Sequence, residues 1–311
     1  MQGVRIPMHK SIDRGIMLFI AVVVVSGWLG VLVDSILADQ PPGNSLGMGI
    51  WLALPMLTAF AIIAFSRMGW KDIGIKPNFK GNGKWYLAAV LIYPVVTTSV
   101  LLTGAAGQWI DLSALDLKLL FWGFSSTLLS NFIIDIFEET AWRGYLTSQL
   151  LRLHLADWKM YLLVGCVWGM WHIPYYLVFL PESIIQAVMP VDRITYVLIS
   201  FTTFLSWTVM FTELFRVTKS IWPCVVLHMV EDSLINLLLL SGFISIASGK
   251  EILISPINGV ITSMLYLAVG LRIRVYRIRA DRESGGGALN CRSSSKAILC
   301  GQDRFRGADR C

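Results

Sequence analysis

Charged side chains are scarce in this sequence. Of its 311 residues, 15% are Asp, Glu, Lys or Arg and 55% are hydrophobic, whereas soluble domains carry about 25% charged residues. Histidine and cysteine are also few, at four and five, and neither the H-E-x-x-H zinc motif nor a C-x-x-C pair occurs. No internal repeat is visible, which weakens a secondary-transporter interpretation. These absences argue against a soluble domain, a soluble-type zinc protease and a thiol redox protein.

The chain contains long apolar runs instead. Its mean hydropathy is +0.65, and stretches of roughly 20 apolar residues, the length that a helix needs to cross a bilayer, recur along it. We therefore predict an all-α, polytopic membrane protein of about eight transmembrane helices. The predicted spans are residues 16–37, 46–65, 85–106, 119–137, 158–180, 194–215, 221–240 and 252–271. Residues 144–157 are predicted to continue the fourth helix or to lie at the membrane interface.

The distribution of Lys and Arg orients these spans. Of the 26 basic residues, 23 lie on the side that holds both termini, and Lys118, Arg193 and Lys250 lie on the other. By the positive-inside rule both termini are predicted to be cytoplasmic. Membrane orientation thus explains the net charge of +6, and we expect a lipid bilayer, and no nucleic acid, as a partner.

We divide the chain into three parts. Residues 1–118 supply about three generic spans, and residues 119–272 form a core of about five spans that carries the candidate site. Residues 273–311 form a basic cytoplasmic tail. The tail contains the run Ser284-Gly285-Gly286-Gly287 and has little apolar content, so we expect it to be disordered.

Two adjacent glutamates, Glu138 and Glu139, end the fourth apolar run. A charge at membrane depth is costly unless it is paired or faces water. Glu139 stands four residues before Arg143, the spacing of a helical ion pair, and adjacent helical residues point about 100° apart. Glu138 is then the freer carboxylate and the better candidate for chemistry, with Asp135 able to share its face. The alternative is a solvated helix end with an ordinary salt bridge.

A histidine lies well inside the fifth span. Trp168 and His172 stand four residues apart and share a helix face, and Pro174 frees a backbone carbonyl one turn earlier. Gly165 and Gly169 allow a neighbouring helix to approach closely. The structural alternative for His172 is a hydrogen-bonded packing residue.

The seventh span holds His228 and Asp232, four residues apart. They place a ring nitrogen and a carboxylate on one face, which suits a metal pair or a histidine oriented by an acid. Glu231 is three residues from His228 and can reach the same place. The alternative is a polar contact that holds helices together.

Three motifs thus follow one another over residues 119–236: E-E-x-x-x-R, aromatic-x-x-x-His and H-x-x-x-D. In this order, on separate spans, they resemble the CPBP family of CAAX prenyl proteases and bacteriocin-processing or bacteriocin-immunity enzymes, also called the Abi family. The resemblance implies an intramembrane endopeptidase that cleaves a membrane-associated, prenylated or leader peptide at the cytoplasmic side. It also implies that Glu139 and Arg143 support the site.

The resemblance further implies roles for the other four residues. Glu138 would be the general base, and His172 would help it to position and activate water. His228 and Asp232 would stabilise the oxyanion. A second view of the family makes it a zinc enzyme with Glu138, His172 and His228 as ligands, and these are ligand types that zinc prefers. The residues leave both views open.

Two positions depart from the family pattern. Trp168 stands where Phe is frequent, and Asp232 stands where Asn is frequent. Because an ionised carboxylate repels an oxyanion, Asp232 must be protonated, orient His228, or bind a metal.

Helix geometry sets a condition on this reading. His172 is 13 residues past Lys159, or ~20 Å along its helix, while Glu138 lies near a helix end. Helix tilt, or a cytoplasm-facing conical cavity, must bring the two together. Two other functions stay open: a non-catalytic immunity or scaffold protein, and a proton-coupled transporter that uses buried acids and His172 as a relay.

Overall fold

The computed structural model of the protein describes residues 8–37, 40–41, 44–66 and 69–302, and within these ranges the side chains of residues 14–283. In this part of the chain, seven helices are long and apolar enough to cross a membrane. They confirm the first seven predicted spans, and the protein is a multi-pass membrane protein. In chain order, the long helices of these seven spans are α1 (Met8–Ile36), α2 (Leu46–Phe65), α3 (Gly83–Ala106), α4 (Leu117–Glu139), α6 (Asp157–Pro174), α8 (Arg193–Thr218) and α9 (Trp222–Leu240).

Shorter elements join or extend these helices. They are η1 (Trp70–Ile73), η2 (Thr140–Thr147), α5 (Ser148–Arg152), η3 (Tyr175–Phe179), α7 (Glu182–Val188), and the strands β1 (Ile110–Asp111) and β2 (Ser245–Ile246). The two strands pair antiparallel, with Ile110 opposite Ile246. Neither strand was predicted from the sequence. Elsewhere the described structure is helical or irregular.

The eighth predicted span, residues 252–271, is divided in the structure. A short helix, α10 (Glu251–Ile254), is followed by a turn, and α11 (Val260–Gln302) begins after it. Pro256 has no N–H to donate to a continuing helix. Gly259 packs so closely on the preceding turn that a Cβ there would be 2.5 Å from the Ser255 nitrogen. The apolar part of α11 is therefore shorter than predicted, which corrects the number of uninterrupted spans.

The division of the chain into three parts, with a disordered tail over residues 273–311, stays a prediction. In the described part of the chain α11 runs on to Gln302. The first seven residues and residues 303–311 lie outside the described part of the chain.

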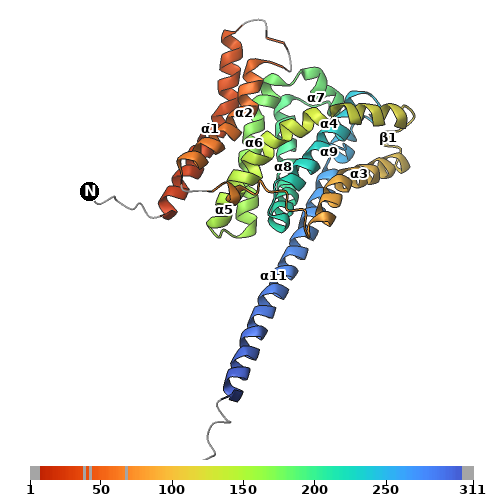
Figure 1. Ribbon diagram of the computed structural model, residues 1–311. Coiled ribbons are helices and arrows are strands. Elements are labelled where there is room, and N and C mark those ends of the chain that lie inside the picture. The colour runs from red at the N-terminus through yellow and green to blue at the C-terminus, as the bar shows by residue number, and fades with distance from the viewer. Residues whose placement is uncertain (1–7, 38–39, 42–43, 67–68, 303–311) are drawn as a thin grey trace, which may run out of the picture.

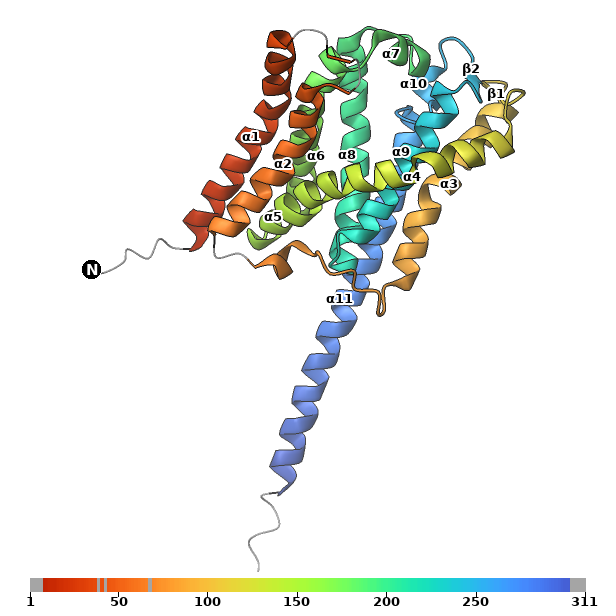
Figure 2. The same ribbon diagram turned by 45° about the horizontal axis from the view of Figure 1, so that its top comes forward.

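One long helix differs from its neighbours in direction. In Figures 1 and 2, α1, α2, α6 and α8 run side by side, whereas α4 crosses the bundle obliquely and packs on α9. The start of α1 and the far end of α11 lie at the same end of the bundle (Figure 2). The tilt of α4 carries its last residues inward to α6 and α9. This is the helix tilt that was needed to bring Glu138 close to His172.

Local sequence features fix where α4 begins and how it ends. The Asp116 carboxylate caps its first turn by accepting the N–H groups of Lys118 and Leu119. At the other end α4 passes without a break into η2, a π-helix. There the Thr147 hydroxyl donates to the carbonyl of Trp142 at 2.8 Å. This wide turn confirms the predicted helical continuation, and π-turns of this kind are frequent at functional sites.

Two glycines set the distance between α1 and α2. A Cβ at Gly47 would lie 2.2 Å from the carbonyl oxygen of Gly30, and one at Gly30 would lie 2.3 Å from that of Gly47. Only hydrogen fits at either position. The Asp34 carboxylate also accepts the N–H of Gly47 at 2.8 Å. The α1–α2 hairpin is therefore held tightly where it packs on α6.

Candidate active site

Ionisable side chains at the end of α4 and the start of η2 are directed into the protein. Asp135, Glu138, Glu139 and Arg143 are each at most 8% exposed. Arg143 Nη1 donates to Glu139 Oε1 at 2.9 Å, and both side chains are fully buried. This is the ion pair that the spacing predicted. Because Glu139 takes up the arginine, Glu138 is left for another partner.

His228, from α9, contacts the same carboxylates. Its Nδ1 lies 3.0 Å from Glu139 Oε1 and 3.6 Å from Asp135 Oδ1. One oxygen of Glu139 therefore links Arg143 to His228. A ring nitrogen that donates to a carboxylate is fixed in its tautomer and orientation, and this leaves Nε2 of His228 for another partner.

Trp168, from α6, joins the remaining groups. Its indole Nε1 donates to Glu138 Oε2 at 3.3 Å, and its backbone carbonyl lies 2.9 Å from His172 Nδ1. The Arg143 guanidinium lies over its ring, 4.4 Å from the centroid, and the ring of His228 packs edge-on at 5.8 Å. The motifs on α4, α6 and α9 thus meet around one tryptophan.

His172 and Asp232 are the more exposed members of the group, each partly buried. The imidazole of His172 stacks on Phe204 of α8, with ring centroids 4.3 Å apart. The Asn236 amide donates to Asp232 Oδ1 at 3.4 Å. These two residues form the least buried edge of the group.

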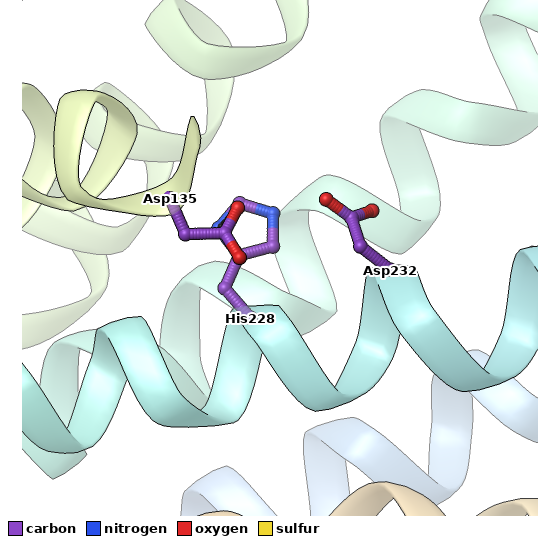
Figure 3. A group of neighbouring side chains, drawn as sticks. All are labelled: Asp135, His228 and Asp232. Atoms are coloured by element: carbon purple, nitrogen blue, oxygen red, sulfur yellow. Dashed lines mark ion pairs between the residues drawn. The ribbon is translucent and has the colours of Figure 1, made fainter. Parts of the chain in front are cut away.

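Part of this group also has the chemistry of a metal site. Ligand atoms of Asp135, His228 and Asp232 all lie within 4.8 Å of one another. Figure 3 shows the Asp135 carboxylate beside the His228 ring and the Asp232 carboxylate facing it from farther along α9. Both Asp135 oxygens are buried without a hydrogen-bond partner, and a cation would satisfy them.

These three residues therefore fit a divalent cation in donor type. They share only His228 with the ligand set expected from the sequence, which was Glu138, His172 and His228. That set stays a prediction.

A comparison with known families bears on this geometry. Residues 120–234, which carry all of these groups, match the family model described as Type II CAAX prenyl endopeptidase Rce1-like. The chain contains an Rce1-like domain. The domain runs from α4 into α9 and includes all three motifs, which confirms the family resemblance. No curated protein matches the chain.

The Rce1-like domain brings together all of the site residues that the sequence predicted: Glu138, Glu139, Arg143, His172, His228 and Asp232. Two contributions were missed. Trp168 was expected to share a helix face with His172, but its indole contact with Glu138 was not predicted, although a buried indole N–H needs a partner. Phe211 of α8 lies under the Arg143 guanidinium, 4.3 Å from it, and no motif on that helix indicated it.

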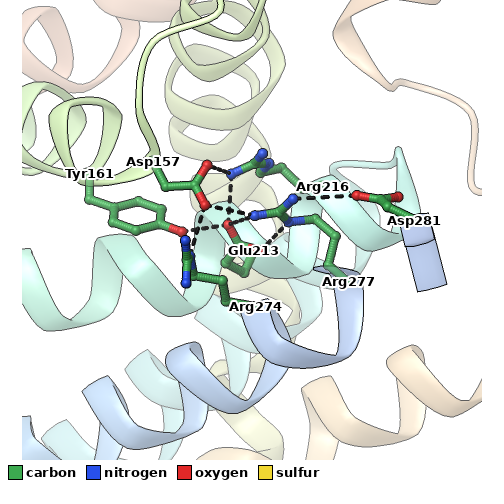
Figure 4. Close-up of polar contacts among 7 residues, drawn as sticks. All are labelled: Asp157, Tyr161, Glu213, Arg216, Arg274, Arg277 and Asp281. Carbon is green, nitrogen blue, oxygen red and sulfur yellow. Dashed lines mark hydrogen bonds and ion pairs between the residues drawn. The ribbon is translucent and has the colours of Figure 1, made fainter. Parts of the chain in front are cut away.

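A second buried charge cluster ties α6, α8 and α11 together (Figure 4). Asp157 pairs with Arg216, Arg274 and Arg277 at 2.8–2.9 Å, and Glu213 pairs with Arg277 at 2.6 Å. Burial is the largest influence and would lower the pKa of Arg277, but the hydrogen bond to Glu213 and the negative charges of Glu213 and Asp157 together outweigh it and raise the pKa. Within the described part of the chain no ion pair joins this cluster to the first. Because each of its carboxylates is paired with arginine, we regard it as structural.

Proposed function

We propose that the protein is an intramembrane endopeptidase that hydrolyses a peptide bond of a membrane-associated, prenylated or leader peptide. The observation that carries the proposal is the contact of Trp168 with Glu138, His172 and His228. It places a carboxylate and two imidazoles from three helices around one side chain. The match to the Rce1-like family supports the same reaction class.

In this proposal Glu138 is the general base. It accepts a proton from water, whose oxygen attacks the carbonyl carbon of the scissile bond. His172, held by the Trp168 carbonyl, orients that water. The protonated Glu138 then gives the proton to the leaving nitrogen as the C–N bond breaks. Water supplies both the hydroxyl of the new acid and the proton of the new amine, so the reaction balances.

His228 and Asp232 act on the carbonyl oxygen. Glu139 holds Nδ1 of His228, so the Nε2 side of the ring is available, and in its doubly protonated form the ring donates to the oxyanion of the tetrahedral intermediate. Asp232 serves in its protonated form or orients the ring. Glu139 and Arg143 hold His228 and take no part in proton transfer.

A divalent cation is the alternative to this arrangement, because a doubly protonated His228 has no lone pair to offer a metal. Asp135, His228 and Asp232 would hold it, and when bound it would polarise the scissile carbonyl. The zinc ligand set expected from the sequence is the competing assignment.

The test is a cleavage screen with the purified protein in lipid nanodiscs. Peptides that end in a C-a-a-X box with a prenylated cysteine, matched unprenylated peptides and leader peptides are incubated and their products identified by mass spectrometry. We expect cleavage of at least one class by the wild type, and cleavage slower by at least about 10²-fold by Glu138→Gln. Glu283→Gln, at an exposed position of α11, is the matched control and should cleave normally.

Absence of cleavage in all three classes, or equal cleavage by Glu138→Gln, would overturn the proposal. The second outcome would favour a non-catalytic role for the buried cluster. The screen is repeated after metal removal and after zinc is added back, with Asp135→Asn beside the wild type. This comparison distinguishes the two proposed sets of cation ligands.

A further inference from the structure

A tryptophan outside the Rce1-like domain contacts the candidate site. Trp51 lies on α2, and its side chain is 7% exposed. Its indole Nε1 donates to the carbonyl of Trp171 at 2.9 Å. In return, Nε1 of Trp171 donates to the carbonyl of Trp51 at 3.1 Å. This reciprocal pair joins α2 to α6 at the residue that immediately precedes His172.

The Trp51 ring is also held between two aromatic rings of the neighbouring segment. It stacks on Trp171 with centroids 4.1 Å apart, and on Tyr175 with centroids 4.8 Å apart and planes 3° from parallel. Tyr175 begins η3, where Leu180 N donates to the Tyr175 carbonyl five residues back. Pro174 ends the regular helix just before.

His172 lies with its ring edge-on to this stack. Its ring centroid is 4.7 Å from Trp171, 5.8 Å from Trp51 and 6.3 Å from Tyr175, and its Nδ1 is fixed by the carbonyl of Trp168. These contacts come from a residue before His172 in the sequence, from one after it, and from Trp51 on a separate helix. Removing Trp51 would release the backbone segment that carries His172. It would also remove one of the rings that surround the imidazole.

We infer that Trp51 is a positioning residue for His172. By its hydrogen bond to Trp171 and its stack on Tyr175, the α1–α2 hairpin holds the imidazole where it orients water. The inference relies on the proposed function for its kinetic consequence. The α1–α2 hairpin is then part of the enzyme's working site, and the Rce1-like domain alone is incomplete.

The test compares Trp51→Phe, which keeps an aromatic ring but loses the donor, with Trp51→Ala, which loses both. Trp122→Phe, 62% exposed on α4, is the matched control. We expect Trp51→Phe to lower kcat about tenfold, the effect of losing one buried hydrogen bond, with KM within about twofold of the wild type. The alanine variant loses more, and the control is unchanged.

A spectroscopic readout separates positioning from general loss of structure. The protein is labelled with 15N-histidine, and the His172 ring resonances are assigned by their loss in His172→Gln. Trp51→Phe should shift these resonances and leave those of His228 in place, and thermal unfolding of the variant should remain a single transition near that of the wild type.

Unmoved His172 resonances overturn the inference, whatever the rates. So does a shift of the resonances with an unchanged kcat. If the wild type cleaves no peptide, the proposed function fails, but the resonances still decide whether Trp51 positions His172.

Discussion

Trp168 contacts four ionisable side chains of the site through three different parts of the residue. Its indole N–H reaches Glu138, its carbonyl holds His172, and its ring lies against Arg143 and His228. The backbone contact survives any substitution, whereas the other three depend on the side chain. Substitution at this one position therefore separates packing from hydrogen bonding.

We predict that Trp168→Phe retains cleavage, with kcat lowered by at most about tenfold, because one long hydrogen bond is lost while an aromatic face remains for Arg143. Trp168→Ala should lose at least about a further tenfold in kcat and should unfold at lower temperature, since a buried Trp→Ala change costs about 3–5 kcal/mol. Steady-state kinetics and thermal unfolding of both variants check the order. Equal rates for the two variants would contradict it.

Arg143 offers a test of the buried ion pair. Removing one partner of a buried pair costs about 3–5 kcal/mol, here because Glu139 loses its arginine and keeps only its contact with His228. We expect Arg143→Ala to lose that much stability in thermal unfolding in detergent. Arg152→Ala is the control, because its pair with Asp72 is 36% and 41% exposed and should contribute less than about 1 kcal/mol. Similar losses in both would contradict the assignment.

Spacing along one helix predicted the contacts within it, as with Glu139 and Arg143. Contacts between helices were not predictable from spacing. Nothing in the sequence indicates that Glu139 also reaches His228 on α9, or that Asp135 faces that ring as well as its neighbour Glu138. These depend on how two helices cross, and residue order does not specify that angle.

At the scale of elements, the apolar runs located seven spans because a bilayer requires a fixed length of apolar helix. They failed at residues 252–271, where composition is apolar but Pro256 interrupts the backbone pattern. The tilt of α4 was not predicted from the sequence, which showed only that tilt or a conical cavity was needed to bring Glu138 and His172 together. Its apolar residues surround the whole helix, and several, including Leu119, Phe121 and Leu129, are exposed by 59–71%, so no single face marks the side that packs.

The α1–α2 crossing gives a prediction at this scale. Gly47→Ala places a methyl group against the Gly30 carbonyl, which should separate the helices and cost about 1–3 kcal/mol. Gly49→Ala, on the same helix with nothing within 4 Å of the added Cβ, should be neutral or slightly stabilising. Thermal unfolding of the pair checks this. A Gly47 variant as stable as the Gly49 variant would contradict the close crossing.

Across the whole molecule, the start of α1 and the end of α11 lie at one end of the bundle (Figure 2). That arrangement agrees with an even number of passes even though α11 is not apolar enough to count as a span of its own. Which end faces the cytoplasm remains a prediction from the distribution of Lys and Arg.

Cysteine labelling tests the orientation. In a background without native cysteines, Lys80→Cys and Ser113→Cys place thiols in exposed loops at opposite ends of α3. A membrane-impermeant maleimide should label Ser113→Cys in intact cells and Lys80→Cys only after permeabilisation. The reverse pattern would invert the orientation and place the site's approach on the other side.

The central claim is that side chains from separate helices act as one hydrolytic site, and a double-mutant cycle in Glu138 and His172 tests it most directly. With the peptide found in the cleavage screen, kcat is measured for Glu138→Gln, His172→Gln and the double variant. If the two residues act on one water, each single change lowers kcat by at least about 10²-fold. The kcat of the double variant is then no more than about threefold below that of the less active single variant. Losses that multiply, or single variants that keep the wild-type kcat, would contradict the account.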